Sequence, residues 1–178
     1  VFYLDAVFIS HEDYDHCGAL TSLKEHFKVK QVIYDFKKKT IGDLVFKNLA
    51  LDKYYTNSND RSSIIYVTIN RLNYLFTGDI SKEVESDLYQ TYHHLDVDVL
   101  KVAHHGSSSS SSEDLFKMID PKVALISVGK NNRYRHPSYL TLKRLEAYGV
   151  KIYRSDLQGM VKIVYYVGKN YVMTSSGF

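Results

Sequence analysis

Four potential metal ligands, His11, Asp13, Asp15 and His16, lie within six consecutive residues of the sequence. Residues 1–9 before them are mostly apolar and predict a buried strand, and residues 20–27 after them have a helical pattern. The four side chains are therefore expected on a turn from strand to helix. Imidazole and carboxylate ligands together suit zinc or manganese, and ligands this close can serve two ions. The alternative is an accidental cluster on a polar loop.

Further acidic and imidazole side chains follow apolar segments later in the chain. Asp79 comes after the segment 74–77 and a glycine, and His104 and His105 come after the segment 97–102, so each is predicted at a strand tip. His136 is predicted on a loop after a strand at 123–128. The alternatives are a turn aspartate before a helix, a structural histidine pair and a solvated loop histidine.

His104 and His105 are expected at the end of an extended strand, where successive side chains point to opposite sides. The two side chains therefore cannot easily bind the same ion. We expect one of them to be a ligand and the other to bind substrate or to orient a ligand. The sequence leaves open which is which.

The remaining segments alternate between strand-like and helix-like patterns. Helices are predicted at 81–88, 113–119 and 138–148, and strands at 29–34, 63–69, 74–77, 97–102, 123–128 and 151–153, with a closing hairpin over 160–174. Residues 41–51 predict a strand more weakly. Lysines 37–39 are interpreted as part of a solvated loop, with a phosphate contact as the alternative.

These segments resemble the motifs of the metallo-β-lactamase superfamily. His11-x-Asp13-x-Asp15-His16 is similar to the usual His-x-His-x-Asp-His signature of that family, and aspartate at the second position resembles the branch that contains ComEC-type DNA-uptake channel proteins. Three later stretches fit that branch in their order and spacing: LFTGDI at 75–80, LKVAHHGS at 100–107 and SVGKNNRYRHP at 127–137.

The resemblance implies one domain over residues 1–178, an αββα sandwich of two packed sheets with helices outside. The mixture of hairpins and strand–helix alternation suits that architecture. Relatives usually have several strands before the histidine–aspartate turn, whereas this chain starts immediately before it. We therefore expect a domain that lacks its first strands, in which apolar sheet surface is open or a partner covers it.

The resemblance also implies two divalent ions, Zn²⁺ or Mn²⁺, which would acidify a water and neutralise phosphoryl oxygens. His11 and Asp13 would serve one ion, Asp15 and His16 would serve the other or act on the water, and Asp79 would bridge the two ions. Asp13 stands where histidine is commoner. Its harder oxygen ligand shifts the preference from zinc toward manganese.

Residues close to these ligands are candidates for catalysis and substrate contact. His136, which precedes a proline as in the relatives, is expected to be a last ligand or a general acid for the leaving oxygen. Phosphate and base contacts are expected from Lys101, Asn131, Arg133, Tyr134 and Arg135, with ordinary surface roles as the alternative. The six serines at 107–112 are interpreted as a flexible loop at the site, with a linker as the alternative.

Composition sets the remaining limits. The chain has 178 residues, 44% of them apolar, which is enough for one domain with a substantial core. Its net charge of +3 is compatible with a polyanionic substrate, and its single cysteine excludes an internal disulfide. No apolar run approaches the roughly 18 residues of a membrane helix. The first residue is not Met, so we expect a piece of a longer or processed chain.

We predict a metal-dependent phosphodiester hydrolase, a nuclease that cuts DNA during uptake without reading its sequence. The residues indicate the hydrolase. The DNA substrate, a parent chain with transmembrane segments and an extracytoplasmic location come from the resemblance. The alternatives are a phosphodiesterase for a small or cell-wall phosphodiester and a nucleic-acid-binding module that has lost activity. Self-association through the open sheet surface is also expected.

Overall fold

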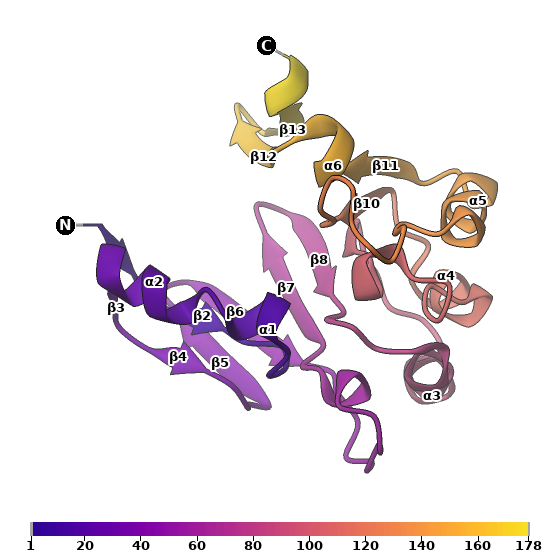
Figure 1. The fold of residues 1–178 in the computed structure, drawn as a ribbon, viewed down its shortest axis with the longest axis horizontal. Coiled ribbons are helices and arrows are strands. Elements are labelled where there is room, and N and C mark those ends of the chain that lie inside the picture. The colour runs from indigo at the N-terminus through magenta and orange to yellow at the C-terminus, as the bar shows by residue number, and fades with distance from the viewer. Residues whose placement is uncertain (1, 178) are drawn as a thin grey trace.

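A seven-stranded mixed sheet forms the centre of the computed structural model, which describes residues 2–177. The strand order is β11-β10-β9-β8-β7-β6-β5 (Figure 1). β8 to β11 pair in parallel, and β5 to β8 pair as antiparallel neighbours. The strands are β5 (Lys38–Ile41), β6 (Leu44–Asn48), β7 (Ile65–Ile69), β8 (Leu72–Phe76), β9 (Val99–Lys101), β10 (Val123–Ile126) and β11 (Lys151–Arg154).

Three helices cover one face of this sheet: α3 (Lys82–Tyr92), α4 (Glu113–Ile119) and α5 (Tyr139–Ala147), on the right in Figure 1. Each helix connects two neighbouring parallel strands, which is the usual reason for a helix to lie on a parallel sheet. Fully buried apolar side chains from the helices and the strands form the core between them, among them Leu75, Leu88, Leu100, Phe116 and Leu145.

The N-terminal part lies beside the other face of the sheet, at the left of Figure 1. It holds two short parallel pairs, β1 (Tyr3–Leu4) with β3 (Lys28–Val29) and β2 (Val7–Phe8) with β4 (Val32–Ile33). The helices α1 (Tyr14–Cys17) and α2 (Leu20–His26) connect them. The ring of Phe8 packs against Phe46 of β6 at a centroid distance of 4.6 Å, so this part is held to the sheet by aromatic contact.

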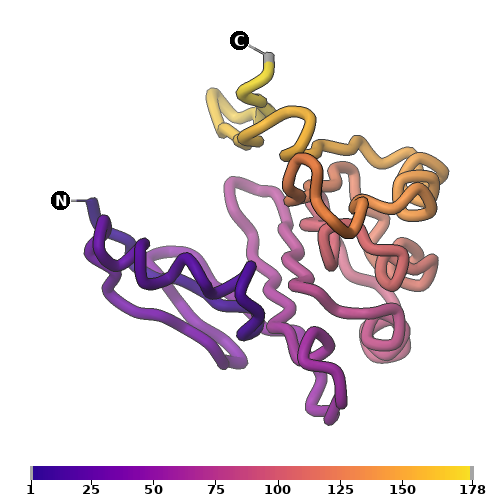
Figure 2. Tube along the Cα trace, in the orientation of Figure 1, coloured from indigo at the N-terminus to yellow at the C-terminus, as the bar shows by residue number. Residues whose placement is uncertain are grey.

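The C-terminal part adds the short helix α6 (Ser155–Gln158) and the hairpin of β12 (Val161–Tyr166) and β13 (Lys169–Thr174). The Cα trace in Figure 2 shows this hairpin at the opposite end of the molecule from the loop that precedes β7. Asn170 donates a hydrogen bond from its side chain to the carbonyl oxygen of Asn70, in the turn between β7 and β8, at 3.1 Å. Within residues 2–177, no helix has the length and apolar character needed to cross a membrane.

The predicted fold class is confirmed: the chain is a mixed α/β protein with a central mixed sheet. The second layer is built from two-residue strands. The single strand predicted over residues 1–10 is in fact β1 and β2, separated by Asp5 and Ala6. The lysines expected in a solvated loop lie partly in β5, where alternate side chains can face solvent while the backbone pairs with β6. The helices α1 and α6 were not predicted, because each has only four residues.

Candidate metal centre

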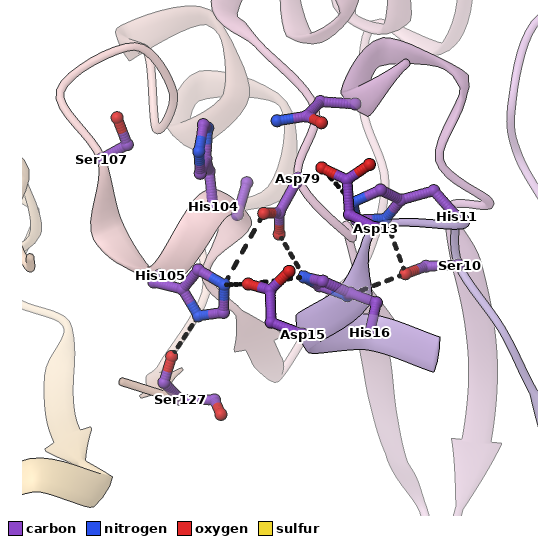
Figure 3. Close-up of polar contacts among 12 residues, drawn as sticks. Ser10, His11, Asp13, Asp15, His16, Asp79, His104, His105, Ser107 and Ser127 are labelled. Carbon is purple, nitrogen blue, oxygen red and sulfur yellow. Dashed lines mark hydrogen bonds and ion pairs between the residues drawn. The ribbon is translucent and has the colours of Figure 1, made fainter. Parts of the chain in front are cut away.

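Four of the predicted ligands converge where the N-terminal part meets the carboxyl ends of β8 and β9. Asp15, His16, Asp79 and His105 each offer one nitrogen or oxygen ligand atom, and these atoms lie within 4.8 Å of one another. We call these four residues the metal group. His16 Nε2 is 3.2 Å from Asp79 Oδ1, and His105 Nε2 is 3.1 Å from Asp15 Oδ2 (Figure 3). Asp15 and His105 are 90 positions apart in sequence, yet their side chains meet at this site.

Asp79 reaches the metal group because Gly78 precedes it. Gly78 has φ +54°, a left-handed conformation that side chains with a Cβ rarely adopt. A Cβ at this position would lie 2.6 Å from the Cβ of Ser62, so any larger residue would push the strand tip away from the loop before β7. The glycine in the stretch 75–80 is therefore a requirement of close backbone packing.

His104 and His105 occupy a tight 3₁₀ turn, Ala103–Gly106, after β9. The expectation that they lie on an extended strand was wrong, because both have left-handed backbone conformations, with φ +49° and +52°. Non-glycine residues with this backbone conformation occur at turns and at functional sites. Gly106 closes the turn against Pro137, where a Cβ would come within 2.5 Å of the proline ring. The two imidazoles consequently point to different neighbours.

His105 points into the metal group, and His104 points toward His136. The Nδ1 of His105 lies 2.6 Å from the carbonyl oxygen of Ser127, which can only accept, so Nδ1 carries the proton and donates. The lone pair of Nε2 then faces Asp15 Oδ2 at 3.1 Å and Asp79 Oδ2 at 3.7 Å. The ring of His104 lies 5.8 Å from that of His136. This geometry favours His105 as the ligand that the sequence left undecided.

The hydroxyls of Ser10 and Ser62 contact the Nδ1 atoms of the other two histidines, His11 and His16. Ser10 Oγ lies 3.1 Å from the Nδ1 atoms of both His11 and His16. The fully buried Ser62 lies 3.2 Å from His11 Nδ1, donates its own proton to the carbonyl oxygen of Asn59 and accepts the backbone N–H of Asp79. Because Ser62 has one proton, His11 Nδ1 must be the donor to it, which leaves His11 Nε2 unprotonated.

His11 and Asp13 lie next to the metal group without belonging to it. His11 Nε2 is 3.8 Å from Asp13 Oδ2, and the His11 ring is 4.1 Å from that of His16. Asp13 and Asp15 are exposed, whereas His11 and Asp79 are buried. The imidazole of His11 and the carboxylate of Asp79 therefore form the buried part of the site. The carboxylates of Asp13 and Asp15 form its solvent-exposed rim.

Unsatisfied atoms show that these residues fit a cation. His11 Nε2, His16 Nε2 and Asp79 Oδ1 are buried and lack a hydrogen-bond partner among the described residues. Buried polar atoms without partners are costly, and a cation would satisfy all three. With Nδ1 protonated, His105 Nε2 and Asp15 Oδ2 are two acceptors at 3.1 Å, a contact that requires a proton or a cation between them. Imidazole with carboxylate is a donor set for a divalent transition metal.

The electrostatics of the centre keep its members in ligand form. Burial and the neighbouring His16 lower the pKa of His11, which favours the neutral imidazole. Burial opposes ionisation of Asp79, but the contact with His16 at 3.2 Å, together with the charge of Lys101, outweighs burial and holds the pKa of Asp79 well below its ordinary value. Burial, with His104 and His105, lowers the pKa of His136.

The predicted substrate residues separate into two sets. Lys101 is not a surface contact: its Nζ is buried without a hydrogen-bond partner beside His16 and Gly78, and burial lowers its pKa. Asn131, Arg133, Tyr134 and Arg135 lie exposed on the loop that leads to His136. Asn132, which the sequence did not single out, fixes this loop, because its amide donates to the carbonyl oxygen of His136 at 2.7 Å and accepts from the His136 N–H at 2.9 Å.

The six serines at 107–112 form a loop that hydrogen bonds hold to the rest of the domain. The alternative interpretation as a linker was therefore wrong. Ser110 and Ser111 are fully buried, although Ser108 and Ser109 are exposed. The buried carboxylate of Glu85, on α3, accepts the backbone N–H groups of Ser111 at 2.7 Å and Ser112 at 2.6 Å. Neither Glu85 nor the serines behind the histidines, Ser10 and Ser62, were predicted. Ser10 adjoins the motif and offered a local signal, whereas Ser62 offered none.

The fold is that of metallo-β-lactamase proteins, and the chain is similar to members of that superfamily. The family model described as "Metallo-beta-lactamase superfamily" matches residues 3–57. Among solved structures, the metallo-beta-lactamase fold protein YhfI from Bacillus subtilis is 12% identical, with a TM-score of 0.51 over 85% of this chain and 74% of its own. CmlA beta-hydroxylase is 10% identical, with a TM-score of 0.55 over 86% of this chain and 43% of its own. These two likenesses show the fold alone.

Sequence relatives are more specific. The chain is 31% identical to ComE operon protein 3 of Bacillus subtilis over 97% of its length, and 28% identical to recombination protein 2 of Haemophilus influenzae over 92%. It is 28% identical to competence protein ComA of Neisseria gonorrhoeae over 89%. The chain spans about a quarter of these relatives, namely 26%, 22% and 25% of their lengths. The resemblance to the metallo-β-lactamase superfamily and its competence branch is thus confirmed.

Proposed function

We propose that this chain is a metal-dependent phosphodiester hydrolase that cuts DNA during uptake. The observation that carries the proposal is the convergence of Asp15, His16, Asp79 and His105 on one point, with unsatisfied nitrogen and oxygen atoms aimed at it. The competence relatives support the link to DNA uptake, and the superfamily supports hydrolysis. The transmembrane segments of a parent chain and its extracytoplasmic side stay predictions.

The metal group would hold one divalent ion, and His11 with Asp13 would complete a second site beside it. Bound Mn²⁺ or Zn²⁺ would supply an acidified water and neutralise the charge on the phosphoryl oxygens. Asp79 is the ligand that both sites could share, because it belongs to the metal group and its charge also acts on His11. The exposed Asp15 lies on the rim, where it can accept a proton from an incoming nucleophile.

The remaining residues would receive the substrate. His136 lies on the loop after β10, next to His104, and would donate a proton to the leaving oxygen. Arg133 and Arg135 are exposed on the same loop, where their guanidinium groups can meet flanking phosphates. Lys101 lies behind the carboxylates, and its charge stabilises ionised Asp79. No described element has the form of a helix that reads a DNA groove, so cleavage is expected to be independent of sequence.

Substitution of Asp79 tests the proposal. Asp79→Asn keeps the shape of the side chain but removes the shared negative charge, so cleavage of a labelled single strand is expected to fall at least about a hundredfold, together with metal affinity. The control is Asp87→Asn, the same change on α3, where the carboxylate contacts Lys53 and Tyr55. Cleavage is measured with added Mn²⁺ or Zn²⁺ and with a chelator, on the oligonucleotide and on a small chromogenic phosphodiester.

Each outcome of this experiment is decisive. Equal cleavage by wild type and Asp79→Asn, or cleavage that survives chelation, would reject the metal mechanism. Hydrolysis of the small ester without any cleavage of DNA would reject the DNA substrate and favour a small phosphodiester. DNA binding without hydrolysis of either substrate would favour the inactive binding module.

A further inference from the structure

Three side chains form a stack that leads outward from the metal centre. The ring of Tyr134 lies over that of His136, with 5.7 Å between centroids and 18° between planes. The guanidinium carbon of Arg133 lies 4.7 Å from the Tyr134 centroid, and Arg133 Nη2 donates to the Tyr134 hydroxyl. At its inner end, His136 lies 5.8 Å from His104, the neighbour of His105. The stack thus starts beside the metal group and ends in solvent.

The loop that carries the stack is held in place. Asn132 brackets it, since its amide donates to the carbonyl oxygens of Gly129 and His136, and its carbonyl oxygen accepts the N–H of His136. The backbone N–H of Arg135 also donates to the carbonyl oxygen of Asn132, at 3.1 Å. An aromatic ring on such a loop has a fixed position before substrate arrives, which lowers the entropic cost of binding.

Tyr134 is nevertheless 63% exposed, and both arginines beside it are exposed. A tyrosine that is held but left in water contributes little to the core of its own chain. An aromatic face next to guanidinium groups matches two parts of a polynucleotide, because bases stack on rings and phosphates pair with arginine. Bases inside a duplex already stack on their neighbours and cannot present a face to a side chain.

We propose that Tyr134 is a stacking platform for an unpaired base next to the scissile phosphodiester, so that the site selects single-stranded polynucleotides over duplexes. The proposal rests on the proposed phosphodiesterase function and names its substrate form. Tyr134 would determine specificity. A base would take the place of the exposed Arg133 guanidinium on the ring, and Arg133 and Arg135 would then hold the phosphates on either side of the stacked base.

The test measures binding separately from cleavage. Binding of a single-stranded oligonucleotide that carries one fluorescent base analogue is followed in the presence of chelator, where stacking quenches the fluorescence. Tyr134→Ala is expected to weaken binding about 5- to 150-fold, which corresponds to about 1–3 kcal/mol for a base–aromatic stack, and to abolish the quenching. Tyr134→Phe keeps the ring and is expected to retain both.

The control is Tyr3→Ala. Tyr3 lies on β1, is 61% exposed and also has a cation over its ring, the Nζ of Lys28 at 5.7 Å. It therefore matches Tyr134 in exposure and setting but lies outside the site, and its loss is expected to change neither binding nor quenching. An oligonucleotide in which every base has been removed should bind wild type about as weakly as Tyr134→Ala binds the complete strand, and base removal should have no further effect on Tyr134→Ala.

Several results would overturn the inference: equal binding by wild type and Tyr134→Ala, wild-type binding to duplex as tight as to single strand, or no binding to either. With metal added, the ratio of oligonucleotide cleavage to small-ester hydrolysis should fall in Tyr134→Ala. Failure of wild type to hydrolyse the small ester would instead contradict the proposed function, so the two failures are distinguishable.

Discussion

At the scale of single residues, Ser62 connects two candidate ligands, His11 and Asp79, that come from different parts of the chain. It accepts from His11 Nδ1 and from the backbone N–H of Asp79. Ser62→Ala would leave the buried N–H of Asp79 without a partner and would remove one of the two hydroxyls that contact His11 Nδ1, which is expected to lower the free energy of unfolding by about 1–3 kcal/mol. The His11 ring would also lose its fixed tautomer, so metal affinity is expected to fall about 10- to 100-fold.

Calorimetric titration with Mn²⁺ or Zn²⁺ and thermal unfolding check this prediction. The control is Ser63→Ala, the adjacent buried serine, whose hydroxyl contacts Asn48 and the carbonyl oxygen of Tyr34 and no ligand. If both variants lost metal affinity equally, the effect would be one of general stability, and the positioning role of Ser62 would be refuted.

A site residue could be predicted from the sequence when the other residues of the site lie close to it along the chain. The four ligands around Asp15 are neighbours in sequence, so their types and spacing were visible. Asp79 and the histidine pair could be found because a strand tip leaves a local pattern of apolar residues followed by glycine or polar residues. Ser62 lies 51 positions from His11, and its hydrogen bond exists through tertiary packing. The choice between His104 and His105 likewise depended on a left-handed turn that a pattern of apolar residues does not encode.

At the scale of elements, the serine run shows how neighbouring helices order a segment of low complexity. Six serines carry no hydrophobic pattern, so the sequence predicts flexibility. In the fold, Glu85 of α3 accepts two backbone N–H groups of the loop, and Arg144 of α5 donates to the carbonyl oxygen of Ser111. Thr141 of α5 donates to the carbonyl oxygen of Ser107 at 2.9 Å. Contacts from two helices therefore hold the loop that follows His105.

Glu85 should make stability depend on pH. Burial raises its pKa from 4.5 to about 7, although the two N–H donors favour the anion. The folded state therefore binds a proton more tightly than the unfolded state. The resulting stability is fully present below about pH 4.5 and is lost as pH rises through about 7. Lys82 is the charged side chain that acts against this rise, and Arg144 contacts the same loop.

Glu85→Gln is expected to remove this slope. The amide also offers one acceptor where two N–H groups need one each, so we expect a loss of about 1–3 kcal/mol at low pH. Denaturant unfolding across pH 4.5 to about 7 gives the difference between the two proteins. His11 and His136, whose lowered pKa values produce the opposite trend, contribute equally to both. Glu83→Gln, an exposed change on the same helix, is the control, and parallel curves for wild type and Glu85→Gln would contradict the prediction.

At the scale of the whole molecule, the two faces of the central sheet are covered unequally. Helices α3, α4 and α5 cover one face with a close-packed core. The other face has the small N-terminal strand pairs and the terminal hairpin beside it. The mixed sheet and its helices could be predicted, because each long element has its own hydrophobic period. The cover of the second face could not, because strands of two residues leave no period to detect.

The less covered face has a cavity of about 390 Å³ beside the metal group. Its apolar lining is Phe8, Phe46, Ile65 and Phe76, and its remaining lining is Ser10, His16, Ser63, Gly78 and Lys101. Phe76, on β8, is 39% exposed there. The strands β1 and β2 each pair with one neighbour among the described residues, so each presents an unpaired edge close by. Exposed apolar surface next to free strand edges favours association between copies. We therefore expect the isolated chain to self-associate through this face.

Phe76→Ser should weaken that association. In a two-fold dimer the change occurs once on each copy, and each loses part of the ~1.5–3 kcal/mol that burial of a phenylalanine contributes, so the dissociation constant should rise at least about tenfold. Because Phe76 is 39% exposed in the monomer, only part of this burial energy is lost from the stability of the monomer itself. Leu140→Ser is the matched control, since Leu140 is an exposed apolar side chain on α5, on the helix-covered side of the sheet. Sedimentation velocity over a range of concentrations gives both constants. A wild type that stays monomeric at every concentration, or an equal shift in Leu140→Ser, would show that this face does not join two copies.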